Sequence, residues 1–342
     1  MPGWELIQYL CCRKKENMKR VLGIGNALVD IVITLENDEK LPLLNLPKGS
    51  MQLVDKDRSN AILDSLKGTK WIEAAGGSAA NTIHGLAKLG VPAGFIGMIG
   101  EDELGGFFVR DMIDAGVEPF MIHSDEQTGR AIALITPDSE RTFATYLGAA
   151  VGLSASHIAN FPSVFGKFNI LHLEGYLVQN HELIEMALAE AKKNNLLVSL
   201  DLASYNIVET NRDFLERMIK NYVDIVFANE DEAKSLTGKD PREALISISK
   251  VCKIAVVKTG RNGSLVHTGN EIIEIGIIPV IPLDTTGAGD LYASGFLYGL
   301  AHDLPLNKCG DLGALLAGNV VEVMGAKMPE ERWLKIMETM NK

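Results

Sequence analysis

Short apolar runs rich in β-branched residues alternate along this chain with longer stretches that carry apolar residues at helical spacing. The alternation begins at Met18 and continues through most of the sequence. It predicts βα units, whose strands form a mainly parallel sheet with helices packed on its faces. The core strands that we expect are residues 21–25, 93–99, 170–173, 197–201, 225–228 and 254–258. The clearest helices that we expect are residues 78–89, 103–115, 180–194 and 211–222.

Two regions, residues 31–54 and 117–148, interrupt this alternation, because they read as extended segments with turn residues and no helix between them. We expect them to pair as a small β-sheet outside the main domain, which spans residues 18–342. An open parallel sheet binds ligands at the carboxyl ends of its strands. A β lid facing that edge would therefore enclose a ligand crevice between the two parts.

The composition and net charge of the chain indicate a globular protein and argue against some classes of partner. In a chain of 342 residues, 46% of them hydrophobic, about three quarters of the extended-chain surface can be buried. No apolar run approaches the roughly 20 residues that cross a bilayer, so we expect no contact with a membrane. A net charge of −11 disfavours nucleic acid as a partner. The four cysteines form neither a CxxC pair nor a disulfide framework, which favours the cytoplasm. Residues 1–17 precede the first strand, and we expect a disordered extension there.

The most informative motif is the run from Asp284 to Asp290, in which small residues lead directly into a predicted helix. The backbone N–H groups of Gly287, Ala288 and Gly289 can converge on an anion, and the helix dipole favours negative charge there. Asp290, in the first helical turn, would lie within reach of the bound group. The alternative is a glycine turn in which Asp290 is an ordinary helix-capping acid.

Two further glycine clusters precede or follow predicted strands. Gly76, Gly77 and Asn81 join a strand to a helix, where the backbone can approach a polyol and the amide can bind it. The alternative is a simple strand-to-helix turn. The segment from Gly23 to Asp30 superficially suggests a dinucleotide fingerprint, but its third glycine is missing. Asp30 can accept hydrogen bonds from vicinal hydroxyl groups, or it is an exposed turn acid.

An acidic segment from Asn229 to Glu232 follows the predicted strand at residues 225–228. Such oxygen-rich side chains can organise hydrated Mg²⁺, although an acidic helix start is an equally common explanation. The phosphate-loop pattern GxxxxGK[ST] and the protein-kinase motifs are absent from the sequence.

Taken in order, the clusters at Gly76–Gly77–Asn81, Asn229–Glu232 and Asp284–Asp290 resemble the PfkB, or ribokinase-like, family. The resemblance extends from about Met18 to the end of the chain. It implies a three-layer α/β sandwich with a β lid, which binds ATP and Mg²⁺ in its C-terminal half and the acceptor between sheet and lid.

The resemblance also assigns roles to single residues. It makes Asp290 the catalytic base and Gly287, Ala288 and Gly289 the anion hole. The pair formed by Asn229 and Glu232 would govern the placement of magnesium and phosphate. The residues that complete the implied site are Thr259 and Gly260 in a nucleotide-binding turn, Arg141 as a lid clamp over the phosphates, and Asp284 with Gly325 near a potassium ion. A helix end at Gly325 and an exposed strand arginine at Arg141 are the alternatives.

Within that family, residues 25–30 and 222–227 resemble bacterial adenosine-kinase-like members. Gln52, Tyr176 and Tyr205 fall near positions that line the nucleoside base in that group. We therefore expect a small-molecule kinase, monomeric or homodimeric, that phosphorylates a nucleoside such as adenosine. A ribokinase- or fructokinase-like sugar kinase remains the alternative acceptor class. A non-catalytic ligand sensor and a dinucleotide-dependent oxidoreductase are the alternatives from other functional classes.

Overall fold

The computed structural model describes residues 18–138, 140–269 and 271–340. Its larger sheet contains nine strands in the order β14-β13-β12-β11-β10-β9-β1-β5-β6. They are β1 (Val21–Ile24), β5 (Ala93–Gly100), β6 (Val117–Ser124), β9 (Ile170–Glu174), β10 (Leu197–Asp201), β11 (Ile225–Asn229), β12 (Ile254–Lys258), β13 (Ser264–His267) and β14 (Ile272–Ile275). Neighbours from β12 to β6 are parallel, whereas β13 and β14 extend the sheet antiparallel. All six predicted core strands are present, and the predicted α/β class is confirmed.

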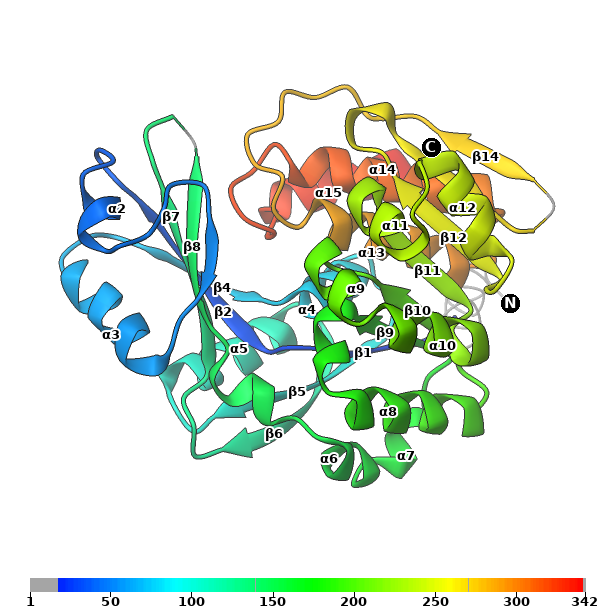
Figure 1. Cartoon of the computed structure of the whole chain (residues 1–342), viewed down its shortest axis with the longest axis horizontal. Helices are drawn as coiled ribbons and strands as arrows, with labels where there is room; N and C mark the ends of the chain where they lie inside the picture. Colours follow the sequence, from blue (N-terminus) through cyan, green and yellow to red (C-terminus); the bar gives the residue numbers. More distant parts are fainter. Residues whose placement is uncertain (1–17, 139, 270, 341–342) are drawn as a thin grey trace, which may run out of the picture.

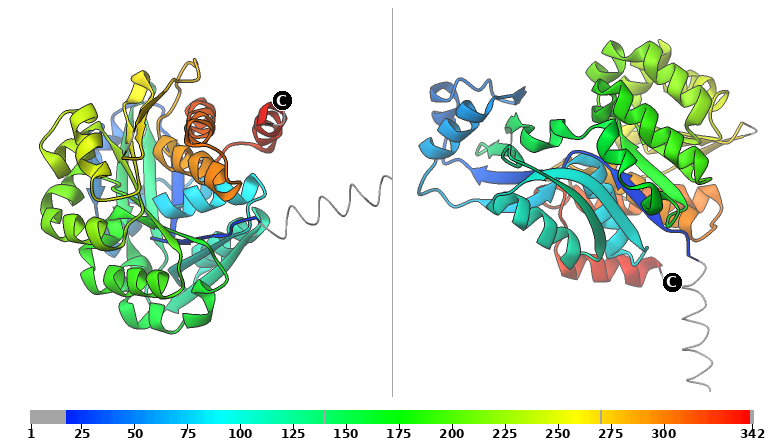
Figure 2. Two further views of the ribbon diagram at one scale, coloured as in Figure 1. Left: turned by 90° about the vertical axis from the view of Figure 1, so that its right-hand side faces the viewer. Right: turned by 90° about the horizontal axis from the view of Figure 1, so that it is seen from below.

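Helices cover both faces of this sheet and make it the middle layer of a sandwich (Figure 1). One face packs against α4 (Ser78–Lys88), α5 (Glu103–Asp114), α13 (Ala288–Ala301) and α14 (Leu306–Val320). The other face packs against α8 (His181–Lys193), α10 (Arg212–Tyr222), α11 (Glu230–Thr237) and α12 (Pro241–Ser249). The last helix, α15 (Glu330–Met340), packs on α14 and lies on the opposite side of the sheet from α8 (Figure 2).

A second sheet of five strands projects beside the larger one and forms the lid (Figure 1). Its order is β3-β8-β7-β2-β4. The strands are β2 (Leu28–Thr34), β3 (Met51–Leu53), β4 (Ile72–Gly76), β7 (Gly129–Ile135) and β8 (Arg141–Tyr146), and the short helices α2 (Lys40–Leu43) and α3 (Lys56–Ser65) accompany them. The chain enters the lid from β1 directly into β2, and it leaves β4 directly into α4. The lid and the body therefore meet at the start of α4.

The lid differs from the sequence prediction in three respects. Residues 117–124 form β6, which pairs with β5 in the larger sheet, so this part of the predicted lid segment belongs to the body. The error has a physical cause, because β6 is an edge strand whose polar side chains face solvent, unlike the fully buried β5. Residues 72–76 join the lid as β4, and α2 forms one helical turn inside the segment expected to be extended. The extension predicted for residues 1–17 lies outside the described residues.

Candidate active site

Four neighbouring strands of the larger sheet end in polar side chains at one edge. Glu174 ends β9, Asp201 ends β10, Asn229 ends β11 and Lys258 ends β12. In the strand register Glu174 is opposite Asp201, and Asn229 is opposite Lys258. Side chains alternate along a strand, and the buried residues two positions earlier on β11 and β12 pack on the face that carries α13. The four polar side chains therefore point toward that same face.

Helix α13 begins at a glycine turn beside these strand ends. Gly287 precedes the helix with left-handed backbone, at a φ of +75°, a conformation that glycine adopts without steric cost. The first helical hydrogen bond runs from the N–H of Leu291 to the carbonyl of Gly287, at 2.8 Å. The N–H of Ala288 instead bonds to the carbonyl of Thr285, at 3.2 Å. The N–H groups that follow at the start of a helix have no intrahelical partner, so this turn can present donors to an anion.

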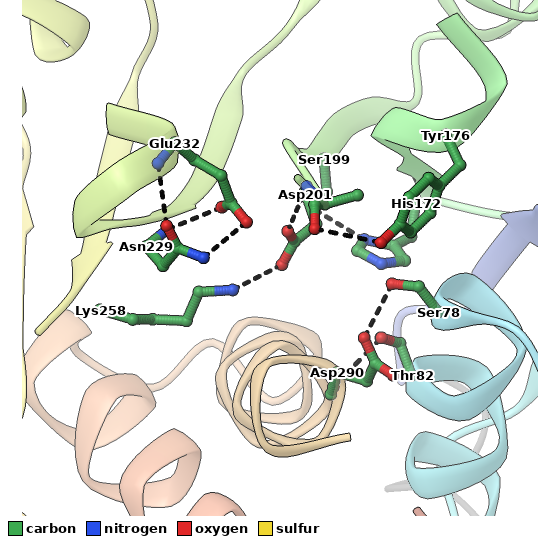
Figure 3. Close-up of polar contacts among 11 residues, drawn as sticks. Ser78, Thr82, His172, Tyr176, Ser199, Asp201, Asn229, Glu232, Lys258 and Asp290 are labelled. Atoms are coloured by element: carbon green, nitrogen blue, oxygen red, sulfur yellow. Dashed lines mark hydrogen bonds and ion pairs between the residues drawn. The ribbon is translucent and has the colours of Figure 1, made fainter. Parts of the chain in front are cut away.

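Asp290 faces the start of α4 from the first turn of α13 (Figure 3). The hydroxyl of Ser78 donates to one carboxylate oxygen at 2.7 Å, and the amide of Asn81 donates to the other at 3.0 Å. The hydroxyl of Thr82 donates to the main-chain carbonyl of Asp290, at 3.1 Å. Burial raises the pKa of Asp290 to about 6, although the hydrogen bonds from Asn81 and Ser78 lower it. A carboxylate with a pKa near neutrality suits proton abstraction.

The opposite wall of this space is formed by the antiparallel strand pair β2 and β4. A Cβ atom on Gly76 would lie 2.5 Å from the carboxylate of Asp30, and one on Gly77 would lie 2.1 Å from the carbonyl oxygen of Asn26. Gly77 also has a φ of +98°. Burial raises the pKa of Asp30 to about 7; the charge of Lys327 lowers it and the charge of Asp290 raises it. Polar backbone and two carboxylates thus surround one small space.

A buried carboxylate joins the two loops that build this wall. One oxygen of Glu174 accepts the N–H of Asn26 at 2.9 Å and its side-chain amide at 2.6 Å, and the other oxygen accepts the N–H of Ala79 at 2.8 Å. Glu174 is fully buried, and burial raises its pKa to about 7. These bonds hold the turn between β1 and β2 against the start of α4.

A cavity of about 880 Å³ opens beside Asp290 on the side of β10 to β12. This volume is within the range of roughly 300–1,000 Å³ that is typical of small-molecule sites. The residues singled out from the sequence that line it are Tyr176, Asn229, Glu232, Gly260, Gly287, Ala288, Gly289 and Asp290. Apolar side chains, including Ile277, Ile278 and Val280, line it as well. The cavity therefore combines a polar end near Asp290 with apolar surface that could contact a base.

Asn229 and Glu232 form a reciprocal cap at the start of α11. The N–H and the side-chain amide of Asn229 each donate to the carboxylate of Glu232 at 2.7 Å, and the N–H of Glu232 donates to Asn229 at 2.9 Å. Burial and the nearby charge of Asp201 raise the pKa of Glu232 to about 7, whereas Lys258 lowers it. Among the described residues, no cluster of three His, Cys, Asp or Glu side chains forms a metal cage. These oxygens fit a hydrated Mg²⁺ ion that also binds phosphate, as ATP-linked magnesium does.

The guanidinium group of Arg141 reaches from β8 of the lid to the glycine-rich turn. It forms an ion pair with the buried carboxylate of Asp284 and donates to the hydroxyl of Thr286 at 2.5 Å. The other carboxylate oxygen of Asp284 accepts the N–H of Gly325 at 2.5 Å. The lid thus already supplies a cation at the carboxylate where the sequence analysis expected potassium. Arg141 contacts the turn beside the predicted anion hole, and potassium at this position stays a prediction.

Gln52, Tyr205 and Thr259 were also predicted to bind ligands, but they do not line the cavity. Gln52 lies on β3 at the edge of the lid, and Tyr205 is exposed at the start of α9 (Tyr205–Thr210). Thr259 is buried, and its hydroxyl donates to the carbonyl of Gly263 at 2.9 Å, which closes the turn after β12. Tyr176 does line the cavity, and its hydroxyl donates to the carbonyl of Ala203 at 3.4 Å.

Four side chains at the centre of the site were not identified from the sequence: Ser78, Glu174, Asp201 and Lys258. Lys258 and Asp201 form an ion pair of 2.8 Å across the end of β11 (Figure 3). A usable signal was present for three of them, because each is a charged residue at the carboxyl end of an apolar strand. Ser78 carried no comparable signal, since a serine that begins a helix is commonly just a cap.

Comparison with known proteins agrees with this geometry. Residues 50–333 match the sequence profile described as pfkB family carbohydrate kinase. The chain belongs to the PfkB family. It is an ATP-dependent kinase with an alcohol group as acceptor, and the oxidoreductase and sensor alternatives are not supported. No helix in the described part of the chain is long and apolar enough to span a membrane.

Relatives in this family differ in the acceptor that their names specify. A probable sugar kinase from Rhizobium etli CFN 42 is 35% identical, covers 95% of this chain and 98% of its own, and superposes with a TM-score of 0.84. Adenosine kinase from Sinorhizobium meliloti is 34% identical over 94% of this chain and 99% of its own, also with a TM-score of 0.84. A 5-dehydro-2-deoxygluconokinase from Geobacillus kaustophilus is 27% identical over 74% of this chain and 79% of its own.

Proposed function

We propose that this PfkB-family kinase transfers the γ-phosphoryl group of ATP to the 5′-hydroxyl of a nucleoside, with adenosine as the expected acceptor. The main support for a nucleoside acceptor is the 34% identity with an adenosine kinase over 94% of the chain. The ring of Tyr176, which lines the cavity together with Ser78 and Asp290, supports the choice because a purine stacks well on an aromatic ring. A free sugar is the second candidate, because the relative at 35% identity is described as a probable sugar kinase.

In the proposed reaction Asp290 is the general base. Its carboxylate takes the proton of the acceptor hydroxyl as that oxygen forms a bond to the γ-phosphorus, while the bond from the γ-phosphorus to the bridging oxygen breaks and ADP leaves. The N–H groups at the start of α13 would stabilise the charge on the transferring group. One well-aimed donor of this kind contributes about 3 kcal/mol to transition-state stabilisation.

The acceptor would lie between Asp290 and the paired strands β2 and β4. Asp30 has a carboxylate beside Gly76, where it would accept hydrogen bonds from vicinal hydroxyl groups. The side-chain oxygen of Asn81 is buried without a hydrogen-bond partner in the described chain, although its amide binds Asp290. This unpaired acceptor supports a polyol at the same place, because a substrate hydroxyl would satisfy it.

The donor nucleotide would occupy the part of the cavity of about 880 Å³ that is lined by Gly260, Ile277 and Ile278, which leaves Tyr176 to the acceptor base. In this proposal its phosphates point to Gly287 and Gly289, and the turn at Thr259 and Gly260 borders the nucleotide. Glu232 would hold Mg²⁺ through its water shell, and the ion would neutralise phosphate charge when bound.

Measuring ADP release with adenosine, inosine, cytidine, ribose and fructose under one condition tests both activity and acceptor. We expect the highest kcat/KM with adenosine, because stacking of the base helps to position the 5′-hydroxyl against Asp290. Higher kcat/KM with ribose or fructose would assign the protein to the sugar kinases. Turnover with none of the five would require another hydroxylated acceptor.

A further inference from the structure

Lys258 is a largely buried cation in a cavity that has an excess of acidic side chains. The cavity is lined by five acidic side chains, Asp201, Glu230, Asp231, Glu232 and Asp290, and by two basic ones, Lys258 and Arg261. Arg261 is exposed, whereas the side chain of Lys258 is 16% exposed. A cavity with this excess of negative charge would repel a triphosphate unless a cation inside the cavity contacted the phosphates.

The ammonium group of Lys258 lies next to the glycine turn that begins α13. A Cβ atom added to Gly289 would lie 3.0 Å from Nζ of Lys258. An anion held by the N–H groups of that turn would therefore touch the ammonium group. The carboxylates of Asp201 and Glu232 raise the pKa of Lys258 against the lowering effect of burial, so the group stays charged.

We propose that Lys258 is a phosphate-binding residue, whose ammonium group leaves Asp201 for the γ-phosphoryl group when ATP occupies the cavity. The proposal deepens the proposed function and rests on it. The exchange breaks one ion pair and forms another, with no proton transferred. Lysine suits this role because its ammonium group is a point charge on a flexible stem. Asp201 keeps a partner after the exchange, since its other oxygen accepts the N–H of Ala203 at 3.0 Å.

The competing explanation is that Lys258 only neutralises buried Asp201, and a set of variants separates the two. The variants are Lys258→Met, Asp201→Asn and the two changes combined. If Lys258 binds phosphate, Lys258→Met should lower kcat by about 10²–10³-fold, as loss of one charge-stabilising donor typically does. The double variant should be more thermally stable than either single variant, because neither charge is left without its partner, but its kcat should stay low.

Lys253→Met is the matched control. Lys253 forms an ion pair of 2.7 Å with Asp224 just before β12 begins, at the opposite end of the strand from Lys258. The pair is exposed on the lysine side, so its loss should leave kcat and the KM for ATP unchanged. A double variant of Lys258 and Asp201 with the kcat of Asp201→Asn would overturn the proposal.

A binding measurement keeps the inference independent of the acceptor. Calorimetry would compare ADP with the β,γ-imido analogue of ATP, each with magnesium, in the native protein and in Lys258→Met. We expect Lys258→Met to lower the affinity for the analogue more than the affinity for ADP, because only the analogue carries the γ-phosphate. An equal loss of affinity for both ligands, or no loss for either, would overturn the proposal. This holds even if the native protein turned over none of the acceptors. Absence of turnover alone would count against the proposed acceptors and not against Lys258.

Discussion

At the scale of single residues, Asp290 shows how neighbours determine the chemistry of a side chain. The motif around it predicts an acid in the first turn of a helix, but an acid there can be a simple cap. The structure instead directs both carboxylate oxygens at α4, where Ser78 and Asn81 donate to them. Burial raises the pKa of Asp290 to about 6. These contacts, and not the helix position alone, support a base at this site.

Replacing Asp290 by asparagine should lower kcat by about two to four orders of magnitude, because the amide keeps the size of the side chain but cannot accept a proton. Steady-state ADP release measures the effect, and calorimetric binding of ATP checks that the site still forms. Asp303→Asn is the control, since Asp303 is an exposed acid just after the other end of α13. Turnover within a few-fold of the native value in Asp290→Asn would remove Asp290 from the role of base.

The pH profile tests the same residue. A carboxyl group with a raised pKa stays protonated up to higher pH, so the base form of Asp290 is lost as the pH falls through about 6. We expect kcat/KM, which reports groups of the free enzyme, to fall as the pH drops through about 7, where Asp30 and Glu174 become protonated, and further through about 6, where Asp290 does. In Asp290→Asn the part of the fall near pH 6 should disappear. A fall in activity near pH 6 that persists in Asp290→Asn would come from another titrating group.

At the scale of elements, the junction of β4 and α4 depends on one glycine. Gly77 has a positive φ, and an added Cβ atom would lie 2.1 Å from the main-chain carbonyl oxygen of Asn26, a residue that Glu174 holds through its N–H. Glycine patterns in the sequence predicted this turn. They did not show which backbone it would touch, because that contact joins segments about 50 residues apart in the chain.

Gly77→Ala is expected to destabilise the protein by about 3 kcal/mol or more, because strain in φ and a clash with backbone add together. Gly68→Ala is the matched control, since Gly68 has a φ of +90° and no atom within 4 Å of an added Cβ. Gly68→Ala should lower the free energy of unfolding only by the strain of the left-handed conformation, about 1–2 kcal/mol. Urea unfolding followed by circular dichroism measures both. Equal losses in the two variants would show that the Gly77 turn can relax.

At the scale of the whole molecule, Arg141 connects the lid to the glycine-rich turn that precedes α13. Its guanidinium group meets Asp284 and Thr286, which lie 143 and 145 residues further along the chain. An exposed strand arginine was one interpretation of the sequence, and a clamp over the phosphates was the other. The structure shows the group only partly exposed and bound to the turn itself. Arg141 therefore places the lid in direct contact with the glycine-rich turn.

The ion pair between Arg141 and Asp284 predicts how the enzyme responds to monovalent cations. Because a guanidinium group already pairs with Asp284, native turnover should be unchanged when potassium is replaced by tetramethylammonium at constant ionic strength. Arg141→Met should make ADP release depend several-fold on potassium, which can then reach the carboxylate. Arg58→Met is the control, because Arg58 lies on the lid helix α3 and binds the carbonyl of Asn45 at 2.9 Å. A large loss of native activity without potassium would support the cation site expected from the sequence.

The sequence alone determined the features that depend on local backbone geometry and on periodicity. The six buried strands, the helix that starts at the glycine-rich turn and the family all follow from patterns within short windows, because side-chain alternation and glycine conformations are local properties. Only the tertiary structure decided which charges meet. Ser78 lies 212 residues from Asp290, and Lys258 lies 57 residues from Asp201. The first pair forms because α4 and α13 pack together, and the second because parallel strands place distant residues at one edge of a sheet. Neither residue of a pair shows in the sequence which residue its partner will be. The edge position of β6 was missed for the same reason, since strand order is a property of the assembled sheet.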